Sequence, residues 1–560
     1  MHTHVRLGCT VLAGVLLTLL ASYRTSIAIA ESPVNLIRTG KAVHPESPGM
    51  PNMEDKMIAR SSSPTPTGDR KTLLFVDDHD VLYRSGTERI ANPAKRFAGN
   101  PIIKQDKPWE AAIAWVTVHR NPGNGKCQLW YQAYAGIRAN DKRFRCVVCY
   151  AESNDGIHFT KPNLGLFPFN DVKDTNIVLI ANGGHSDRYA NAVVFDPLEK
   201  DPARRYKMGY SDFAVDEGKE YPGLCVAFSP DGIHWTKYPK APLHRTSYGK
   251  FESPVPFTDE TGRKWWDNPL TMADAVDVFY DPVRKVFASY ARMWIDGPGG
   301  GMYWKHAMGR IESKDFIHWK DPELVLAPDD QDPPSVEFHT SPVFYYNDRY
   351  FCLNQILNRA VGGGVIDIEL MVSRDGLDWE RPFRKEFFLG RSQPGQFDSG
   401  SVFTNSTPVI LDEEIRFYYG GYQDGATGGD DESMHSGLGF ASIRLDRFAG
   451  IRPVAKSDQP TLSKPLERIG QVTLKPIDLS KFKSISLNAD ASNGTIRVEL
   501  LNSRGRRLRG FAAEDCVSIK GDSLAHKLAW KGVSLGDLPR GHYMLRIHLD
   551  NATVFALSLR

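Results

Sequence analysis

The chain has 560 residues, of which 41% are hydrophobic and 24% are charged, a composition typical of a globular protein with more than one domain. Its formal net charge is +2, and Arg6 and Arg24 account for both charges, so the rest of the chain is neutral. A neutral chain without a run of Lys or Arg lacks the charge needed to bind nucleic acid or an anionic membrane surface, and both are excluded as partners.

The first thirty residues have the pattern of a secretory signal peptide. Arg6 precedes an apolar run that begins at Leu7, and Ala28-Ile29-Ala30 has the small residues of a cleavage site. The run is short for a membrane span, so an uncleaved anchor is only the alternative interpretation. We therefore predict a signal peptide over residues 1–30 and a secreted or periplasmic protein, without stable membrane association after cleavage.

Three segments follow. Residues 31–70 are rich in Pro and Ser and predict a flexible leader. Residues 71–452 contain short apolar or aromatic runs separated by Gly, Pro, Asn and Asp, which predicts β-strands throughout. After a polar connector, residues 463–560 alternate between apolar and polar positions in "TIRVEL", "YMLRIHL" and "VFALSL", which predicts a small C-terminal β-sandwich.

A sequence repeat divides the long β-region. "AESNDGIHFTKP", "AFSPDGIHWTKY", "IESKDFIHWKDP" and "MVSRDGLDWERP" share a Ser-x-Asp turn followed by an aromatic residue, and "GFASIRLDRF" is a degenerate fifth copy. Repeated units of short strands with a turn at a fixed place are typical of propeller blades, so we predict an all-β protein with a five-bladed β-propeller. The Asp and Ser side chains can hydrogen-bond the turn backbone, and we interpret these Asp residues as structural.

The mature chain has six cysteines. Cys146 and Cys149 are three positions apart in a predicted strand, so their thiols point to opposite faces, and no second pair follows at zinc-site spacing. We therefore predict no metal site at these cysteines. A disulfide of Cys127 with Cys146 or Cys149 and a set of buried free thiols both stay open.

One acidic residue opens the first strand of each predicted blade. These residues are Glu110, Asp187, Asp274, Glu337 and Asp398. Because a propeller gathers its inner strands around a central axis, they predict a ring of carboxylates at one end of the channel. Glycosidic cleavage needs a protonated carboxylic acid and a second carboxylate as nucleophile or base, and crowding raises the pKa of the acid. The alternatives are salt-bridged or turn-capping carboxylates and a structural calcium site.

At this point the chain resembles the five-bladed glycoside hydrolases of families 32 and 43, which are invertase-like and arabinanase- or xylosidase-like. The resemblance rests on the turn motif, with "IESKDFIHWKDP" the nearest match, on the acid that opens each blade and on the trailing β-sandwich. It covers about residues 109–448, and more weakly the C-terminal part.

The resemblance implies roles for three carboxylates. Asp274 in "ADAVDVFYDP" matches the second Asp of these families, which stabilises the transition state, and Glu337 ahead of "SPVFYY" matches the general acid. The first-blade nucleophile or base falls on Glu110, where the families have Asp, and the Asn-Asp-Pro-Asn-Gly motif of invertases is absent. Asp77 and Asp78 are rivals for that role, in a segment that is alternatively the closing strand of the last blade.

Further polar and aromatic residues near the predicted ring are candidates for sugar contacts. They are Asp78, Asp187, Arg188, Arg292, Trp294, His339 and Asp398. The sequence therefore predicts an exported glycoside hydrolase that acts on a poly- or oligosaccharide, without a required cofactor. The alternatives are a non-catalytic carbohydrate-binding propeller and a glycoside phosphorylase. A phosphorylase needs basic residues beside the carboxylates, and Arg188 and Arg292 would supply them.

Overall fold

The computed structural model of this protein describes residues 70–183, 191–216, 219–240, 243–245, 256–258, 264–266, 275–297, 304–384, 386–425, 435–454 and 469–560. The chain divides into two units, Met1–Lys56 and Met57–Arg560, and all described residues belong to the second. The predicted signal peptide and leader lie outside the described residues. None of the helices in the described ranges is both long and apolar enough to cross a membrane.

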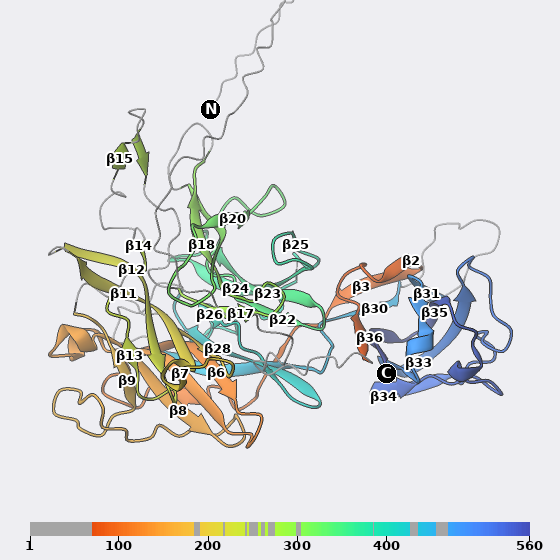
Figure 1. The fold of residues 1–560 in the computed structure, drawn as a ribbon, viewed down its shortest axis with the longest axis horizontal. Helices are drawn as coiled ribbons and strands as arrows, with labels where there is room; N and C mark the ends of the chain where they lie inside the picture. Colours follow the sequence, from red (N-terminus) through yellow and green to blue (C-terminus); the bar gives the residue numbers. More distant parts are fainter. Residues whose placement is uncertain are drawn as a thin grey trace, which may run out of the picture. The chain divides into compact units, whose positions relative to one another are not determined.

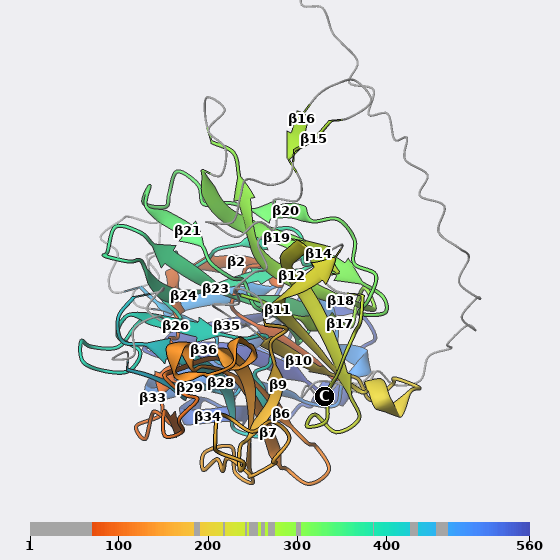
Figure 2. The ribbon, with the colours of Figure 1, turned by 90° about the vertical axis from the view of Figure 1, so that its left-hand side faces the viewer.

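The described part of the chain is all-β, as predicted, and its helices are single 3-10 turns (Figure 1). Strands β6 to β29 divide into five antiparallel units, which we number I to V in chain order. In Figure 2 these units follow one another from orange through yellow and green to teal and cyan. The number of blades stays a prediction, because units IV and V are joined in one sheet by a parallel bridge from Ile366 to Ser401.

Units I to III are separate four- or five-stranded sheets. Unit I contains β6 (Ala112–Arg120), β7 (Cys127–Tyr134), β8 (Cys146–Ser153) and β9 (Ile177–Ile180). Unit II contains β10 (Asn191–Phe195), β11 (Tyr206–Asp216), β12 (Lys219–Ser229), β13 (Thr236–Lys237) and β14 (His244–Arg245). Unit III contains β17 (Phe279–Asp281), β18 (Val286–Ile295), β19 (Lys305–Ser313) and β20 (Glu323–Leu326), and it follows the hairpin of β15 (Pro256–Thr258) and β16 (Lys264–Trp266).

Units IV and V complete this region. Unit IV contains β21 (Val336–Phe338), β22 (Val343–Tyr346), β23 (Arg349–Asn358), β24 (Val365–Ser373) and β25 (Trp379–Glu380). Unit V contains β26 (Ser401–Thr404), β27 (Val409–Ile410), β28 (Glu414–Tyr422) and β29 (Ser436–Arg444). Its outer edge is formed by β4 (Lys95–Arg96) and β5 (Ile103–Lys104), which precede unit I in the chain and pair with β29. A propeller is closed in this way when one end of the region supplies a strand to the sheet at the other end.

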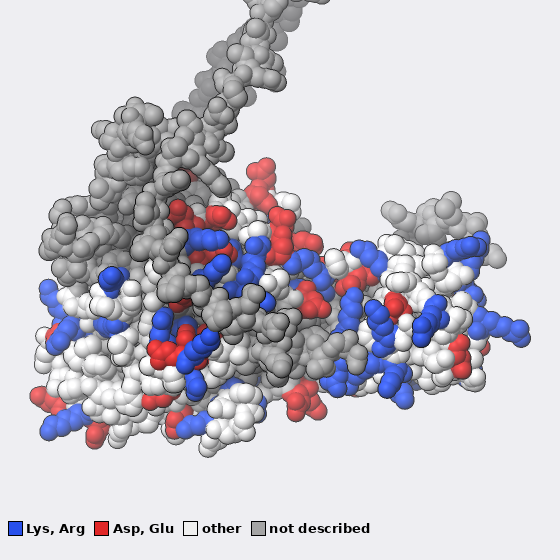
Figure 3. Space-filling model, in the orientation of Figure 1, with Lys and Arg blue, Asp and Glu red and all other residues white. Residues whose placement is uncertain are grey.

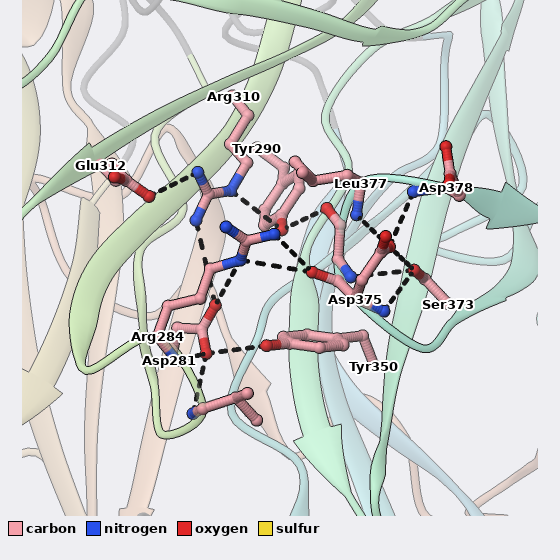
Figure 4. Close-up of polar contacts among 12 residues, drawn as sticks. Asp281, Arg284, Tyr290, Arg310, Glu312, Tyr350, Ser373, Asp375, Leu377 and Asp378 are labelled. Atoms are coloured by element: carbon pink, nitrogen blue, oxygen red, sulfur yellow. Dashed lines mark hydrogen bonds and ion pairs between the residues drawn. The ribbon is translucent and has the colours of Figure 1, made fainter.

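The repeated turn is a compact hydrogen-bonded structure. In unit IV, Ser373 Oγ accepts from the backbone N–H groups of Asp375 and Gly376, and Asp375 Oδ1 accepts from those of Leu377 and Asp378 (Figure 4). Units I, II and III have the corresponding bonds to the Asp carboxylate. These bonds confirm the structural interpretation of the repeated Asp residues.

Each turn is also held by the preceding unit. Tyr290 of unit III donates from its hydroxyl to the carbonyl of Gly376 at 2.7 Å, and Arg284 donates to the carbonyl of Asp375 at 3.0 Å (Figure 4). At three other junctions the acceptor is also a carbonyl: Trp130 donates to Gly232, Arg204 to Asp315, and Tyr418 to Gly156. At the remaining junction the Tyr346 hydroxyl donates to the Asp446 carboxylate. The Tyr418 contact closes the series. Because Tyr418 belongs to unit V and Gly156 to unit I, the series of junctions is cyclic.

Glycine follows the Asp in the turns of units I, II and IV, where it has two effects, whereas unit III has Phe316 there with φ +68°. Gly376 has φ +75°, a conformation that L side chains rarely adopt, and a Cβ there would lie 2.8 Å from the Tyr290 hydroxyl. At Gly232 the φ is +82° and a Cβ would lie 2.5 Å from the Trp130 ring. The glycine therefore permits both the backbone conformation and the close approach of the neighbouring unit.

The strands outside the propeller-like region form one ten-stranded sheet, in the order β2-β31-β35-β33-β36-β30-β3, with β1, β32 and β34 beside that path. Their bounds are β1 (Lys71–Leu74), β2 (Val81–Ser85), β3 (Thr87–Ala91), β30 (Ala449–Pro453), β31 (Ile469–Leu474), β32 (Ile477–Asp478), β33 (Ile485–Asn502), β34 (Ile519–Lys527), β35 (His542–Asp550) and β36 (Thr553–Leu559). Figure 1 draws β31, β33 and β35 in blue and β2 and β3 in red-orange. Because only Gly86 separates β2 from β3, the two ends of the path meet and the sheet is nearly closed.

This sheet corrects the predicted domain boundary. The sequence analysis assigned residues 71–91 to the propeller, but β1 pairs with β36, β2 with β31 and β3 with β30. The apolar side chains of Leu73, Phe75 and Val81 join the core of the C-terminal strands, which explains why the segment belongs there. The last unit is closed by β4 and β5, so the alternative interpretation of residues 73–83 as its closing strand is wrong.

We expect Tyr290→Phe to lower the free energy of unfolding by about 1–3 kcal/mol, because it leaves the buried Gly376 carbonyl without its donor and removes the acceptor of Arg310. Urea denaturation of the purified chain measures the change. Tyr238→Phe is the matched control, because the Tyr238 hydroxyl has no hydrogen bond among the described residues, and we expect a change within about 0.5 kcal/mol. Equal stability of the two variants would contradict a stabilising role for the junction.

Candidate active site

Glu337 lies in β21, the first strand of unit IV, and faces unit III. Its Oε2 is 2.5 Å from Nδ1 of His306, which comes from β19. The side chains of His306 and Glu337 are 4% and 13% exposed, so the pair is largely removed from water. Arg359 donates from Nη2 to the same carboxylate oxygen at 3.4 Å. Two cationic partners thus meet one carboxylate at the junction of two units.

These partners set the charge state of Glu337. Burial by itself would raise the pKa of its carboxyl, but the hydrogen bond from His306 and the charges of His306 and Arg359 outweigh burial and lower the pKa below its ordinary value of 4.5. The carboxylate is therefore ionised at neutral pH. A general acid needs a raised pKa so that it keeps its proton at neutral pH, whereas a nucleophile or general base needs a lowered pKa.

Strand β18 brings further predicted residues to the same place. The Trp294 ring lies over the His306 ring, with centroids 3.7 Å apart. Trp294 pairs with His306, and Arg292 pairs with Met308 two residues further along. Side chains two residues apart in a strand share a face, so Arg292 and Trp294 lie on the side of the sheet that carries His306.

His339 follows Glu337 by two residues and is the point where three units meet. Its ring stacks against Trp115 of unit I at 5.8 Å and lies 5.9 Å from Phe403 of unit V. Its Nδ1 contacts Gln355 Oε1 at 2.9 Å, and Gln355 Nε2 donates to the Thr404 carbonyl at 3.2 Å. Because the amide nitrogen of Gln355 donates to Thr404, the amide oxygen is the atom that faces the histidine. This oxygen can only accept, so Nδ1 of His339 carries the proton.

Asp277 is a buried carboxyl that the sequence analysis did not select. It precedes β17, in the stretch that contains Asp274, and accepts from the backbone N–H and the hydroxyl of Ser406, both at 3.2 Å. Burial raises its pKa to about 7, although the bonds from Ser406 oppose the shift. A perturbed pKa of this kind marks candidates for acid chemistry, but sequence alone does not separate Asp277 from its neighbours.

Glu110 has a different environment from the one predicted. Its side chain is fully buried, and its carboxylate binds Lys161 Nζ at 2.7 and 2.9 Å and the Tyr131 hydroxyl at 2.6 Å. It also accepts from the backbone N–H groups of Asp106 and Lys107. All of these partners lie within unit I or the segment just before it, so Glu110 has the contacts of a structural ion pair. This was one of the alternatives considered for each carboxylate.

Asp398 and Asp78 are also held in structural networks. Asp398 is 1% exposed and accepts from Arg96 at 2.7 Å and from Tyr419 at 2.9 Å. Asp78 pairs with Arg84 and Arg89 at the edge of the C-terminal sheet. Its neighbour Asp77, the other rival for the base, is buried between Arg349 and Arg374. Asp187, Arg188 and Asp274 lie outside the described residues, and their roles stay predictions.

The structure thus joins Glu337 to Trp294 through His306, with Arg292 on the same sheet face as Trp294 and His339 two residues beyond Glu337 in the chain. The sequence offered no signal for His306, because it carries no motif in "MYWKHAMGR" and reaches Glu337 only through the junction of two units. Six cysteines in the described ranges are buried thiols without disulfides. No group of metal-ligating side chains occurs among the described residues, and a structural calcium ion stays a prediction.

Comparison with known proteins gives structural similarities only. No protein-family model and no curated protein sequence matches the chain. Similar solved structures include a glycoside hydrolase at 14% identity, which covers 66% of this chain and 95% of its own, with a TM-score of 0.44. Another comes from work on the GH130 family of mannoside phosphorylases and glycoside hydrolases that target beta-1,2 mannosidic linkages in Candida mannan. It has 19% identity, coverages of 66% and 96%, and a TM-score of 0.39.

A third similar structure is a Bombyx mori GH32 beta-fructofuranosidase, at 10% identity, with coverages of 84% of this chain and 94% of its own and a TM-score of 0.36. These structures include glycoside hydrolases, among them one of family 32, which is one of the two families that the sequence resembles. Similarities of this extent assign neither a substrate nor a catalytic residue to the chain.

Replacing Glu110 distinguishes a structural from a catalytic role. We expect Glu110→Gln to lower the free energy of unfolding by about 3 kcal/mol, because it leaves the Lys161 ammonium, 9% exposed, with Asp106 as its one carboxylate partner beside the Lys104 carbonyl. Thermal or urea denaturation measures the change. Asp106→Asn, which removes a carboxylate that is 63% exposed from the same lysine, should cost under about 1 kcal/mol. If Glu110→Gln folds with unchanged stability, the structural role is wrong.

Proposed function

We propose that the protein is a carbohydrate-active enzyme that hydrolyses glycosidic bonds, with Glu337 as its reactive carboxylate. The observation that carries the proposal is the enclosed contact of Glu337 with His306, which keeps a carboxylate ionised beside an aromatic ring. Glycosidic cleavage proceeds through a positively charged, oxocarbenium-like transition state, which a fixed carboxylate stabilises or attacks.

The surrounding side chains suit a sugar substrate. Trp294 offers an apolar ring to the face of a pyranose or furanose, and Arg292 and Arg359 are donors for hydroxyl or carboxylate groups. In this proposal Glu337 is the nucleophile or general base, and not the general acid that the family resemblance implied. The reason is its lowered pKa. The acid would be a second carboxyl with a raised pKa. Asp277, Glu369 and Asp446 have that property among the described residues, and Asp277 is our candidate because it lies in the stretch that contains Asp274.

A glycoside phosphorylase is the second candidate. Arg359 touches the Glu337 carboxylate, and Arg292 lies on the same sheet face as His306. Basic residues beside a catalytic carboxylate would bind inorganic phosphate in place of water. Export of the protein stays a prediction from the N-terminal sequence.

The direct test is release of reducing sugar from a panel of plant and algal polysaccharides by the purified chain and by Glu337→Gln. We expect the variant to lose roughly 10²–10⁴-fold in rate while it still binds the substrate, because only the reacting charge is removed. Glu386→Gln, at an exposed position, is the matched control and should keep full activity.

Other outcomes discriminate between the candidates. Sugar 1-phosphate formed only when inorganic phosphate is added would identify a phosphorylase. Binding of a polysaccharide by both forms without turnover would favour the non-catalytic propeller. Full activity in Glu337→Gln would rule out Glu337 as the reactive group.

The His306 contact predicts a shift in the pH dependence. The lowered pKa of Glu337 places the acid limb of kcat/KM below pH 4.5, because activity is lost only when the carboxylate is protonated. His306→Asn removes the cation that lowers this pKa while burial continues to raise it, so the acid limb should move to higher pH. A pH–rate profile of both forms measures the displacement. An unchanged acid limb would contradict control of Glu337 by His306.

A further inference from the structure

A short arginine-rich loop follows β33 in the C-terminal sheet, with the sequence "NSRGRRLRG" over residues 502–510. Asn502 Oδ1 accepts from the backbone N–H groups of Arg504 and Arg506, both at 3.0 Å, and the Asn502 carbonyl accepts from Gly505 N–H at 2.9 Å. Gly505 has φ +75°. The loop is therefore a defined turn that presents Arg504 and Arg506 on either side of a glycine.

Only one of the four arginines in the loop is used internally. Arg507 binds Glu499 Oε2 at 2.7 Å and also contacts Glu514. Arg504, Arg506 and Arg509 are exposed, and none of them has an ion pair within the described part of the chain. Structural needs therefore do not account for three of the four guanidinium groups.

The acids near this loop form no ion pair with Arg504, Arg506 or Arg509 in the described residues, and Glu514 contacts Arg507 instead. Gly510 packs against Val533, since a Cβ on it would lie 3.0 Å from Val533 Cγ1, and this contact brings the loop beside the segment that carries exposed Lys531. Glu499 is already engaged by Arg507, Arg546 and His548. Lys and Arg outnumber Asp and Glu over residues 469–560, and Figure 3 shows blue side chains prominent over these strands, at the right of the view.

We propose that Arg504, Arg506, Arg509 and Lys531 form an anion-binding surface for a polysaccharide that carries carboxylate or sulfate groups. Guanidinium groups bind both anions in bidentate fashion, and several of them on one rigid loop match charges repeated along a polymer. The surface is distinct from the Glu337 site, which lies on other sheets, and it does not depend on the reaction catalysed there.

The observations favour a polysaccharide over other polyanions. Val517 is the one large apolar side chain that is strongly exposed among residues 469–560, so the surface has no apolar group set to insert into a membrane. The loop carries no aromatic side chain on which nucleic-acid bases could stack. Nucleic acid and anionic membranes were excluded as partners from the net charge of +2, but this total does not show that residues 469–560 are basic.

Affinity electrophoresis of the full chain tests this surface, in gels containing polygalacturonate, dextran sulfate or neutral dextran. We expect retention by at least one charged polymer and none by neutral dextran, with retention falling as salt is raised. The triple variant R504Q/R506Q/R509Q should bind the retaining polymer roughly tenfold or more weakly, since about half a kcal/mol or more is lost for each exposed charge. Retention by polygalacturonate alone would assign the surface to carboxylates, and by dextran sulfate alone to sulfates.

The matched control is K142Q/K173Q/K200Q, which removes the same charge from three exposed lysines without ion pairs in the described part of units I and II. It should bind like the unmodified chain, and both variants should keep the same Tm. Equal retention of the triple arginine variant, retention by neutral dextran, or tighter binding of DNA or of phosphatidylserine vesicles would overturn the proposal. Activity at Glu337 is measured separately on a soluble neutral substrate, so a failure of the proposed function is distinguishable from a failure of this surface.

Discussion

The carbonyl groups of the repeated turns constrain the whole propeller-like region. Each Ser-x-Asp-Gly turn satisfies its own N–H groups through the Ser and Asp side chains, but its carbonyls point away from the unit. They accept hydrogen bonds from a tyrosine, tryptophan or arginine of the preceding unit. A buried carbonyl without a donor costs free energy, so these bonds favour the packing of each unit against its neighbour. The cyclic series of these contacts fixes how the first strands of the units approach one another.

The candidate active site depends on that constraint. Glu337 and His306 belong to neighbouring units, and their contact at 2.5 Å requires units III and IV to lie side by side, an arrangement that the Tyr290–Gly376 bond and the Ala291–Thr340 bridge both support. His339 in turn touches Trp115 and Phe403 from two further units. A rigid scaffold that holds such side chains in place is what catalysis by a preorganised charge requires.

The pKa values of Glu337 and Asp277 are shifted in opposite directions for a clear reason. Glu337 has cationic partners that lower its pKa, whereas Asp277 is buried with only the neutral donors of Ser406, and its pKa rises to about 7. Carboxyls whose environments separate their pKa values are suited to divide acid and base roles. Glu110 and Asp398 are equally buried, yet their lysine, arginine and tyrosine partners use up the carboxylate oxygens, and no group is left to act on a substrate.

The sequence by itself determined the all-β class, the repeated turn and the structural role of its Asp residues, because these follow from local hydrogen bonding and from alternation along a strand. It also offered Glu337 as a candidate, because the acid that opens each predicted blade can be located from the repeat, whereas Trp294, Arg292 and His339 were candidates only as polar or stacking groups, and the roles of all four stay predictions. Only the tertiary structure decided which carboxylates are available, because Lys161 lies fifty-one residues from Glu110 and His306 thirty-one from Glu337. The same holds for residues 71–91, whose apolar side chains fit two sheets equally well in sequence and are assigned only by their pairing with β30, β31 and β36.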